Sequence, residues 1–393
     1  MKKIIIVINN FETGGVQKSL LNLLKEIKNE YDITLLSFFG NSEFEKEIPK
    51  EVKTIILGSP YKHLGMSKKH IQGMPVQLIA RTFWFFITKI FGRTFTVRLM
   101  GIFQRKLKGY DYAISYLHEV KIHSLHGGCN TFVLQKIKAK EKIAWIHCDF
   151  HLNGANNVYS REIYKKFDKI IACSEGCRQS FIGCFPEFTE KTKTVRNCNE
   201  YIAIKTLAGN GIAYDQTNFN IVTVARLAKE KGIERALEAI SACCKAGHRV
   251  MYHIVGDGNK EQFLKDKVIE FGLENNVVFY GNQNNPYPYI KNADLFLLTS
   301  YHEAAPMVFD EAACLCVPIL ATKTTSTDEM IVELGAGFVC DNSQNAINDA
   351  LLDIITHKEK LIPVTETLRQ YSFDNSKSVS NLKRIIEGGN HTS

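Results

Sequence analysis

The fold is decided by residues 295–312, which read LFLLTSYHEAAPMVFDEA. The apolar run from Leu295 to Leu298 has the length and composition of a buried strand. A polar loop follows, and Pro306 then suits the first position of a helix, where its missing N–H costs nothing. A strand that leads through a loop into a helix is the unit from which parallel sheets are built. The stretch therefore predicts an α/β protein whose chemistry lies in loops after strands.

The same alternation of strand-length apolar runs and helical patterns continues through both halves of the chain. The expected strands of the first half are Ile4–Ile8, Ile33–Phe38, Thr54–Leu57, Tyr112–Tyr116, Ile143–Ile146 and Ile170–Cys173. Those of the second half are Asn220–Val224, Arg249–Val255, Val277–Tyr280, Leu295–Leu298, Ile319–Thr322 and Gly337–Val339. We expect two doubly wound, Rossmann-like domains that face each other across a cleft, where open α/β sheets bind ligands.

Length and composition agree with this organisation. The 393 residues suffice for two domains of about 150 to 200 residues each. The stretch from Leu207 to Asn218 lacks clear periodicity and is the expected linker, so the predicted domains are 1–206 and 207–371. A last helix is expected within 372–393, and it is a candidate to pack back on the first domain.

Two features bear on the compartment. The opening MKKIIIVINN has no cleavage site after its apolar run, so we interpret it as a first buried strand and not as a secretory signal. The eleven cysteines lack the paired CxxC spacing of a zinc site and are expected to be reduced cytosolic thiols.

The basic charge is concentrated in the first half. Residues 1–150 hold 23 Lys and Arg against 12 Asp and Glu, while the remainder holds 26 against 29. No acidic residue lies between Glu51 and Asp111, a segment with many aromatic residues and the cations Lys53, Lys62, Lys68, Lys69, Arg81, Lys89, Arg93, Arg98, Arg105, Lys106 and Lys108. Such a segment favours contact with an anionic membrane surface, although no uninterrupted apolar run of about 20 residues would cross a bilayer. An ordinary core with solvated cations is the alternative, and nucleic-acid binding is the least favoured.

Three loops after strands carry candidate site residues. Gly14 and Gly15 follow the first strand, where glycine lets the backbone approach a ligand and a helix N-terminus attracts an anion. Arg226 and Lys231 follow the first strand of the second half, so two cations are able to converge on one diphosphate.

The strongest signal is the loop and helix that follow Leu298. The free N–H groups of Met307 and Val308 are expected to face phosphate oxygens at the helix N-terminus. The carboxylates of Glu303 and Glu311 are placed to accept hydrogen bonds from different hydroxyls of one sugar nucleotide.

Four motifs occur together in the chain: Glu303 and Glu311 in E-x7-E spacing, Arg226 with Lys231, Gly14-Gly15, and the run from Val255 to Gly258. Through these motifs the chain resembles glycosyltransferase family 4. These are retaining enzymes of the GT-B fold. The resemblance implies that Arg226 and Lys231 bind the donor diphosphate, Glu311 the ribose and Glu303 the donor sugar, with Met307 and Val308 as backbone phosphate donors. It also implies that Gly281 and Gln283 line the nucleobase, that Gly15 nears the phosphates on closure, and that His147 contacts the sugar.

The implied activity is hexosyl transfer from a nucleotide-sugar, with a UDP-sugar favoured, to a saccharide acceptor. We expect this acceptor to be lipid-linked and the protein to be cytoplasmic, peripheral at the inner face of the cell membrane, and to build a surface polysaccharide. No cofactor or metal is expected, because Asp-x-Asp is absent from the sequence, and no nucleic acid is expected as a partner. The sequence departs from the family's usual glycines at Ala304 and Ala305, which puts the donor sugar in doubt. A sugar-nucleotide epimerase of the same fold and a non-catalytic subunit are the alternatives.

Overall fold

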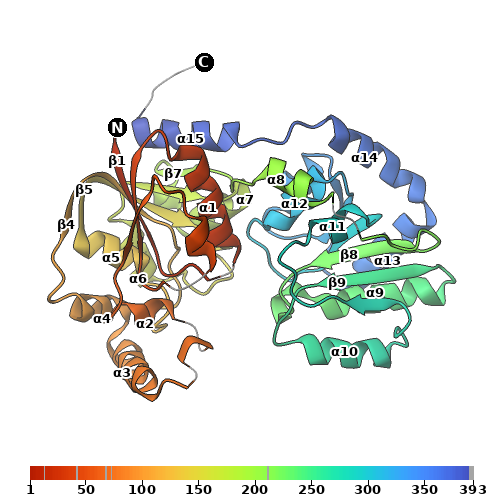
Figure 1. The fold of residues 1–393 in the computed structure, drawn as a ribbon, viewed down its shortest axis with the longest axis horizontal. Helices are drawn as coiled ribbons and strands as arrows, with labels where there is room; N and C mark the ends of the chain where they lie inside the picture. The colour runs from red at the N-terminus through yellow and green to blue at the C-terminus, as the bar shows by residue number, and fades with distance from the viewer. Residues whose placement is uncertain (13, 41–42, 67–68, 72, 210–211, 389–393) are drawn as a thin grey trace. The chain divides into compact units, whose positions relative to one another are not determined.

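The computed structural model describes residues 1–12, 14–40, 43–66, 69–71, 73–209 and 212–388. They form two compact units, each built on one sheet (Figure 1). Unit 1 comprises Met1–Cys198 with Asn375–Ser393, and unit 2 comprises Asn199–Asp374.

The sheet of unit 1 is parallel throughout, in the order β3-β2-β1-β4-β5-β6-β7. Its strands are β1 (Lys3–Ile8), β2 (Asp32–Ser37), β3 (Lys53–Ile56), β4 (Leu107–Ser115), β5 (Ile137–Ile146), β6 (Lys169–Ala172) and β7 (Thr192–Thr194). Its helices are α1 (Gly15–Ile27), α2 (Lys62–Gly65), α3 (Pro75–Phe91), α4 (Arg93–Met100), α5 (Cys129–Lys136), α6 (Val158–Tyr164), α7 (Glu175–Cys184) and α15 (Ser376–Glu387), with 3₁₀ turns at Glu43–Glu47, Lys69–Ile71 and Pro186–Phe188.

Strand β1 is an inner strand of this sheet, between β2 and β4, and is buried on both faces, as parallel strands covered by helices are. Ile5 and Val7 pack on one side with the cluster that contains Phe132 and Phe181. The alternate residues of β1 pack on the other side, against the apolar faces of α1 and α15. The continuous apolar run at the start of the chain is therefore explained by two cores, one on each side of the sheet.

The sheet of unit 2 is also parallel throughout, in the order β10-β9-β8-β11-β12-β13. Its strands are β8 (Phe219–Val224), β9 (Val250–Val255), β10 (Val277–Phe279), β11 (Leu295–Leu298), β12 (Ile319–Thr322) and β13 (Gly337–Cys340). Its helices are α8 (Tyr201–Leu207), α9 (Ile233–Lys245), α10 (Glu261–Glu270), α11 (Tyr287–Lys291), α12 (Met307–Cys314), α13 (Gln344–Thr356) and α14 (Leu361–Gln370), with 3₁₀ turns at Lys229–Lys231 and Lys358–Lys360 and a π turn at Asp328–Val332.

The boundary between the units lies at Cys198/Asn199, eight residues before the boundary at 206/207 that the sequence suggested. The reason is that α8 joins unit 2, where Ile204 and Ala208 are buried. The expected linker also packs there, since the Tyr214 ring stacks on His253 with centroids 3.7 Å apart. A stretch without periodicity is thus fixed by tertiary contacts.

The chain returns to unit 1 at Asn375, after unit 2 is complete. Leu382 and Ile386 of α15 are fully buried in the same cluster as the helix α1. Polar contacts secure both ends of this segment, because Asn375 donates to Glu26 over 2.7 Å and Tyr31 donates to Glu387 over 3.0 Å.

A buried ion pair organises the segment after β4. Arg93, at the start of α4, pairs with Glu119, and both side chains are almost completely buried. The Arg93 guanidinium also donates to the backbone carbonyls of Val120, Lys121 and Ser124, at 3.0 to 3.1 Å. Arg93 is therefore an internal crosslink and not a surface cation, which corrects its place in the basic segment.

We predict that Arg93→Ala lowers the free energy of unfolding of unit 1 by about 3 to 5 kcal/mol, because Glu119 is left as an unpaired buried charge. Urea unfolding followed by tryptophan fluorescence reports this unit, since Trp84 and Trp145 are the only tryptophans of the chain. Lys53→Ala is the control, because it removes an exposed pair with Asp32 and should change stability by less than about 1 kcal/mol. Equal effects of the two substitutions would contradict the role given to Arg93.

Candidate functional site

The candidate donor site of unit 2 lies where the strand order reverses. Strands β8 and β11 are neighbours in the middle of the sheet, although three helices and two strands separate them in the sequence. The loops that follow them, 225–232 and 299–306, therefore meet at the carboxyl edge, where open α/β sheets bind ligands. Arg226 and Lys231 lie on the first loop and Glu303 on the second.

Lys231 and Glu303 are in direct contact across these two loops. The Lys231 ammonium donates to Oε1 of Glu303 over 2.5 Å, and the Ser300 hydroxyl donates to the same oxygen over 2.7 Å. Both charged side chains are largely buried, at 21% and 10% exposed. The structure thus brings together a cation and a carboxylate that the sequence placed 72 residues apart.

Arg226 lies on the surface of the same loop. Its side chain is 69% exposed and pairs with Glu230, four residues further on. Glu230 is more than a solvent-facing residue, since its backbone carbonyl also accepts a hydrogen bond from the N–H of Tyr301 over 2.9 Å. Glu230 therefore joins the two loops and holds the guanidinium at their rim.

Helix α12 opens directly after the Glu303 loop. Pro306 is its extended N-cap and not its first helical residue, so the helix begins at Met307 with Val308 second. The first N–H groups of a helix have no partner within it, which makes this end suitable for an anion. Glu311 is buried in the next turn at 3% exposed.

The turn before α8 contributes to α12. Asn199, in the Asn197-Cys198-Asn199 turn, donates from its side-chain amide to Asp310 over 3.0 Å. The Asn199 side chain thus secures the first turn of the helix.

Close backbone packing fixes the neighbouring loops. Gly256 has a φ of +136°, and a Cβ added there would lie 2.0 Å from the carbonyl oxygen of Ala225. A Cβ on Gly258 would lie 2.3 Å from the carbonyl oxygen of Leu227. Glycine is required at both positions because the loop after β9 lies directly on the loop that carries Arg226.

Gly281 and Gln283 extend this packing to the end of β10. The carbonyl of Gly281 accepts the N–H of Gly256 over 2.8 Å, and the amide of Gln283 donates back to the carbonyl of Tyr280 over 2.7 Å. The predicted nucleobase loop is therefore tied to the loop after β9 and closed on itself by Gln283.

The remaining predicted residues lie in unit 1. Gly14 is the N-cap of α1, and its carbonyl accepts the N–H of Lys18 over 3.0 Å. A Cβ added to Gly15 would meet no atom within 4 Å, so open space adjoins the backbone there. Thr13, within the same loop, lies outside the described residues.

His147 follows β5 and is 9% exposed. Its ring stacks parallel to Trp145 with centroids 5.9 Å apart. Burial lowers the pKa of His147 well below its usual range, and the nearby His118 imidazole lowers it further. The imidazole is therefore neutral at pH 7.

His118 is a candidate that the sequence reasoning missed. It follows Ser115 by three residues, as His147 follows Ala144, and these two strand residues are register partners. Burial lowers the pKa of His118 to about 4. Within the described part of the chain, Nδ1 of His118 and Nε2 of His147 are buried and have no hydrogen-bond partner. Buried polar atoms are normally satisfied, so two neutral imidazoles are available to a hydroxyl-bearing ligand.

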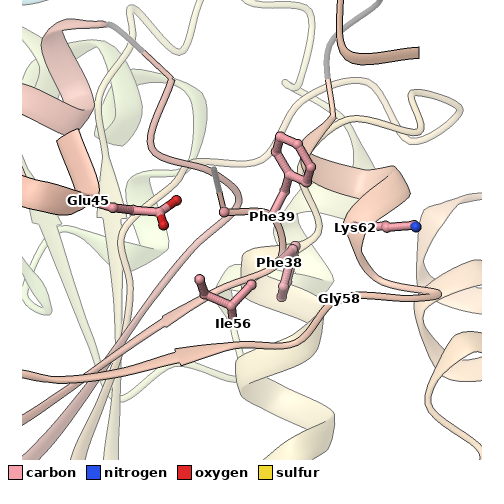
Figure 2. A pocket seen from close by; sticks show the side chains of 7 residues that line it. Phe38, Phe39, Glu45, Ile56, Gly58 and Lys62 are labelled. Carbon is pink, nitrogen blue, oxygen red and sulfur yellow. The ribbon is translucent and has the colours of Figure 1, made fainter. Parts of the chain in front are cut away.

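A separate cavity of about 370 Å³ opens in unit 1. Figure 2 shows Glu45 and Lys62 on opposite sides of Phe38 and Ile56 in this cavity. Its lining contains none of the predicted site residues.

No cluster of three or more His, Cys, Asp or Glu side chains with the arrangement of a metal site occurs among the described residues. Among the described residues, no cysteine forms a disulfide.

Comparison with known proteins agrees with this arrangement. Residues 211–370 match the family model "Glycosyl transferases group 1". The chain is 26% identical over 164 residues to an uncharacterized glycosyltransferase, MJ1059, of Methanocaldococcus jannaschii, covering 40% of each chain. It is 28% identical over 147 residues to the lipopolysaccharide glucosyltransferase WaaG of Escherichia coli, covering 36% of this chain and 38% of WaaG. The aligned part thus spans about two fifths of each relative.

The similarity of fold extends over the whole chain. The crystal structure of Anabaena Alr3699/HepE in complex with UDP superposes with a TM-score of 0.67 over 99% of both chains, at 17% identity. The chain therefore has the GT-B fold, with two Rossmann-like halves.

We predict that His118 and His147 stay neutral from pH 8 to pH 5, because burial disfavours their charged forms. Two-dimensional NMR of the ring Cε1–H groups checks this, with His118→Gln and His147→Gln to assign the signals. An unfolded histidine takes up its proton near pH 6.5, so these groups make the fold less stable as the pH falls from about 6.5. A titration of either ring near pH 6.5 would show that it is hydrated and not part of a buried site.

Proposed function

We propose that the protein is a glycosyltransferase that moves a hexosyl unit from a nucleotide-sugar, with a UDP-sugar favoured, to a saccharide acceptor. We further propose that it is a retaining enzyme of family 4. The observation that carries the proposal is the meeting of Lys231, Glu303 and the N-terminus of α12 at one point on the sheet edge. The segment that matches the family model contains all three.

In this proposal, the departing diphosphate is stabilised by fixed positive charge. Lys231 carries one cation into a largely buried position, Arg226 supplies a second at the rim, and the N–H groups of Met307 and Val308 add the helix dipole. Charges that are already in place cost no reorganisation when the glycosidic bond breaks, and such preorganisation usually dominates catalysis.

The carboxylates then take the sugar and the ribose. Glu303 is held by Lys231 and Ser300 and retains a second oxygen for a donor-sugar hydroxyl. Glu311, one turn inside the helix, is proposed to accept hydrogen bonds from the ribose hydroxyls.

The transfer itself needs no side-chain base. The acceptor oxygen forms its bond to the anomeric carbon on the face that the nucleotide leaves, and the bond from that carbon to the diphosphate oxygen breaks. The proton of the acceptor hydroxyl passes to a donor phosphate oxygen, so configuration is retained without a covalent enzyme intermediate. His147 is proposed to orient the sugar through the unpartnered Nε2 atom.

We propose a lipid-linked saccharide as the acceptor, used at the inner face of the cell membrane in building a surface polysaccharide. The acid-free basic segment of unit 1 supports this, because cations near an anionic leaflet contribute about 1 kcal/mol each. The relative WaaG, which is named for lipopolysaccharide, gives independent support.

A panel of UDP- and GDP-sugars, each with and without saccharide acceptors, tests the activity. We expect nucleotide release that rises with acceptor and a glycoside product. Conversion of the donor to an epimer in the absence of acceptor would show that the protein is an epimerase. The absence of both products with every donor would contradict a catalytic role.

We predict that Arg226→Ala and Lys231→Ala each lower kcat/KM about 10- to 100-fold, because a charge-assisted contact to the diphosphate contributes about 1.5 to 3 kcal/mol. Steady-state transfer assays measure this. Lys229→Ala is the matched control, since Lys229 is an exposed cation of the same loop, and it should retain full activity.

Lys231→Ala also leaves the Glu303 carboxylate without its cation. The double variant Lys231→Met/Glu303→Gln removes both charges, and its comparison with Glu303→Gln alone isolates the loss of the phosphate contact. A double variant as active as the wild type would contradict the donor-site assignment.

We also predict that transfer does not depend on a divalent cation. If Arg226, Lys231 and α12 neutralise the leaving group, the initial rate in excess EDTA should stay close to the untreated rate. Loss of activity that added Mn²⁺ or Mg²⁺ restores would assign that charge to a metal instead.

A further inference from the structure

The exposed surface of α3 is almost entirely apolar. Its exposed apolar side chains are Val76, Leu78, Ile79, Phe83, Phe85, Phe86, Ile90 and Phe91. Val76, Ile79 and Ile90 are each between 66% and 73% exposed. A helix at the surface of a soluble protein normally turns such residues inward, and large exposed apolar patches mark interaction sites.

Two polar side chains of α3, those of Thr88 and Arg81, point into unit 1. Thr88 is fully buried and hydrogen-bonds Thr96 of α4 over 2.9 Å. The Arg81 guanidinium donates to the backbone carbonyls of His63 and Met66 within unit 1. On the exposed side, Thr82 and Lys89 are the only polar residues of the helix. The exposed side of α3 is therefore mainly apolar, although some polar side chains of the helix are turned inward.

The apolar surface continues beyond the helix. Phe91 contacts the ring of Phe95 on α4, with centroids 5.0 Å apart, and Phe95 is itself 44% exposed. Ile102 and Phe103 follow α4, and Phe103 is 96% exposed. Figure 1 shows α3 projecting from the rest of unit 1, beyond α4 and α2. These residues together with the exposed side of α3 are called the α3 patch below.

The segment that carries the patch contains exposed cations and no acidic residue. Lys89, Arg98, Arg105, Lys106 and Lys108 are exposed, and no acidic residue occurs from 52 to 110. Arg81 and Arg93 are turned inward and so do not add to this surface charge. Lys68 and the side chain of Lys69 lie outside the described residues.

The apolar surface of the α3 patch and the positive charge of its segment together indicate which partner the patch binds. A second copy of the chain would bring two acid-free basic surfaces together, and like charges oppose such a contact. An anionic leaflet offers negative headgroups and a hydrocarbon boundary at the same place. No helix among the described residues is long and apolar enough to cross a membrane.

We propose that the α3 patch inserts into the acyl boundary of an anionic membrane leaflet, with α3 lying in the interface. Attachment is then mainly hydrophobic, and the surrounding cations select anionic lipid. The proposal deepens the proposed function, because it names the surface that holds the enzyme beside a lipid-linked acceptor. Its test uses vesicles without substrate, so loss of membrane binding and loss of transferase activity are separate results.

Flotation with vesicles of phosphatidylglycerol and phosphatidylcholine, at low salt and at about 1 M NaCl, measures the binding. Electrostatic attraction is screened over about 3 Å at 1 M salt, so inserted protein should stay bound. We expect Ile79→Ser/Ile90→Ser to lower the partition coefficient at least about tenfold at both salt concentrations, because buried apolar area is lost. We expect Arg105→Gln/Lys106→Gln/Lys108→Gln to weaken binding at low salt only.

Ile269→Ser/Ile362→Ser is the matched control, since these isoleucines of unit 2 are 64% and 59% exposed and lie outside the patch. It should bind as the wild type does. Complete release of the wild type at 1 M NaCl, or unchanged binding of Ile79→Ser/Ile90→Ser, would overturn insertion. The wild type could instead fail to bind vesicles and self-associate in sedimentation velocity. If Ile79→Ser/Ile90→Ser abolished that self-association, the patch would be assigned to a contact with a second copy of the chain.

Discussion

Parallel strand pairing is the constraint on which the rest of this structure depends. Because every strand of a sheet runs in the same direction, all the loops that follow the strands collect at one edge. In unit 2 this edge is packed so tightly that the backbone carbonyl of Ala225 occupies the place that a side chain on Gly256 would need. The loops after β8, β9, β10 and β11 are thereby fixed relative to one another before any ligand arrives. The position of Lys231 beside Glu303 follows from this packing.

Much of the fold and part of the site were predictable, since their signals are local. Apolar runs marked twelve of the strands, all except β7, and the loops after them contained Arg226, Lys231 and Glu303. Contacts that join distant residues gave no such signal. Nothing in the sequence around Arg93 indicates that this residue pairs with Glu119 in the interior. Nor does the sequence indicate that Tyr214 of the expected linker stacks on His253 within unit 2. The position of His118 just after β4 was a usable signal. This signal was missed because His118 lies far from every motif in the sequence.

Lys231 and the cations near α3 present positive charge in different ways. Lys231 is largely buried and already has a carboxylate partner, so its strength comes from low solvation and fixed geometry. The cations around α3 are exposed and unconstrained, which suits them to a fluid array of headgroups. Amino-acid composition does not distinguish a buried, paired cation from an exposed one. Only burial separates a cation that fixes a structure, such as Arg93, from one that meets an outside partner.

The return of the chain to unit 1 has a consequence for how the protein is made. Leu382 and Ile386 fill the core beside α1, yet the ribosome adds them only after all of unit 2. Domains usually fold as they emerge, so the N-terminal part spends the synthesis of some 180 residues with this side of its sheet uncovered. The apolar surface of β1 and α1 that α15 helps to cover lacks this cover during that interval. Unit 1, although its synthesis begins first, is therefore completed only after unit 2.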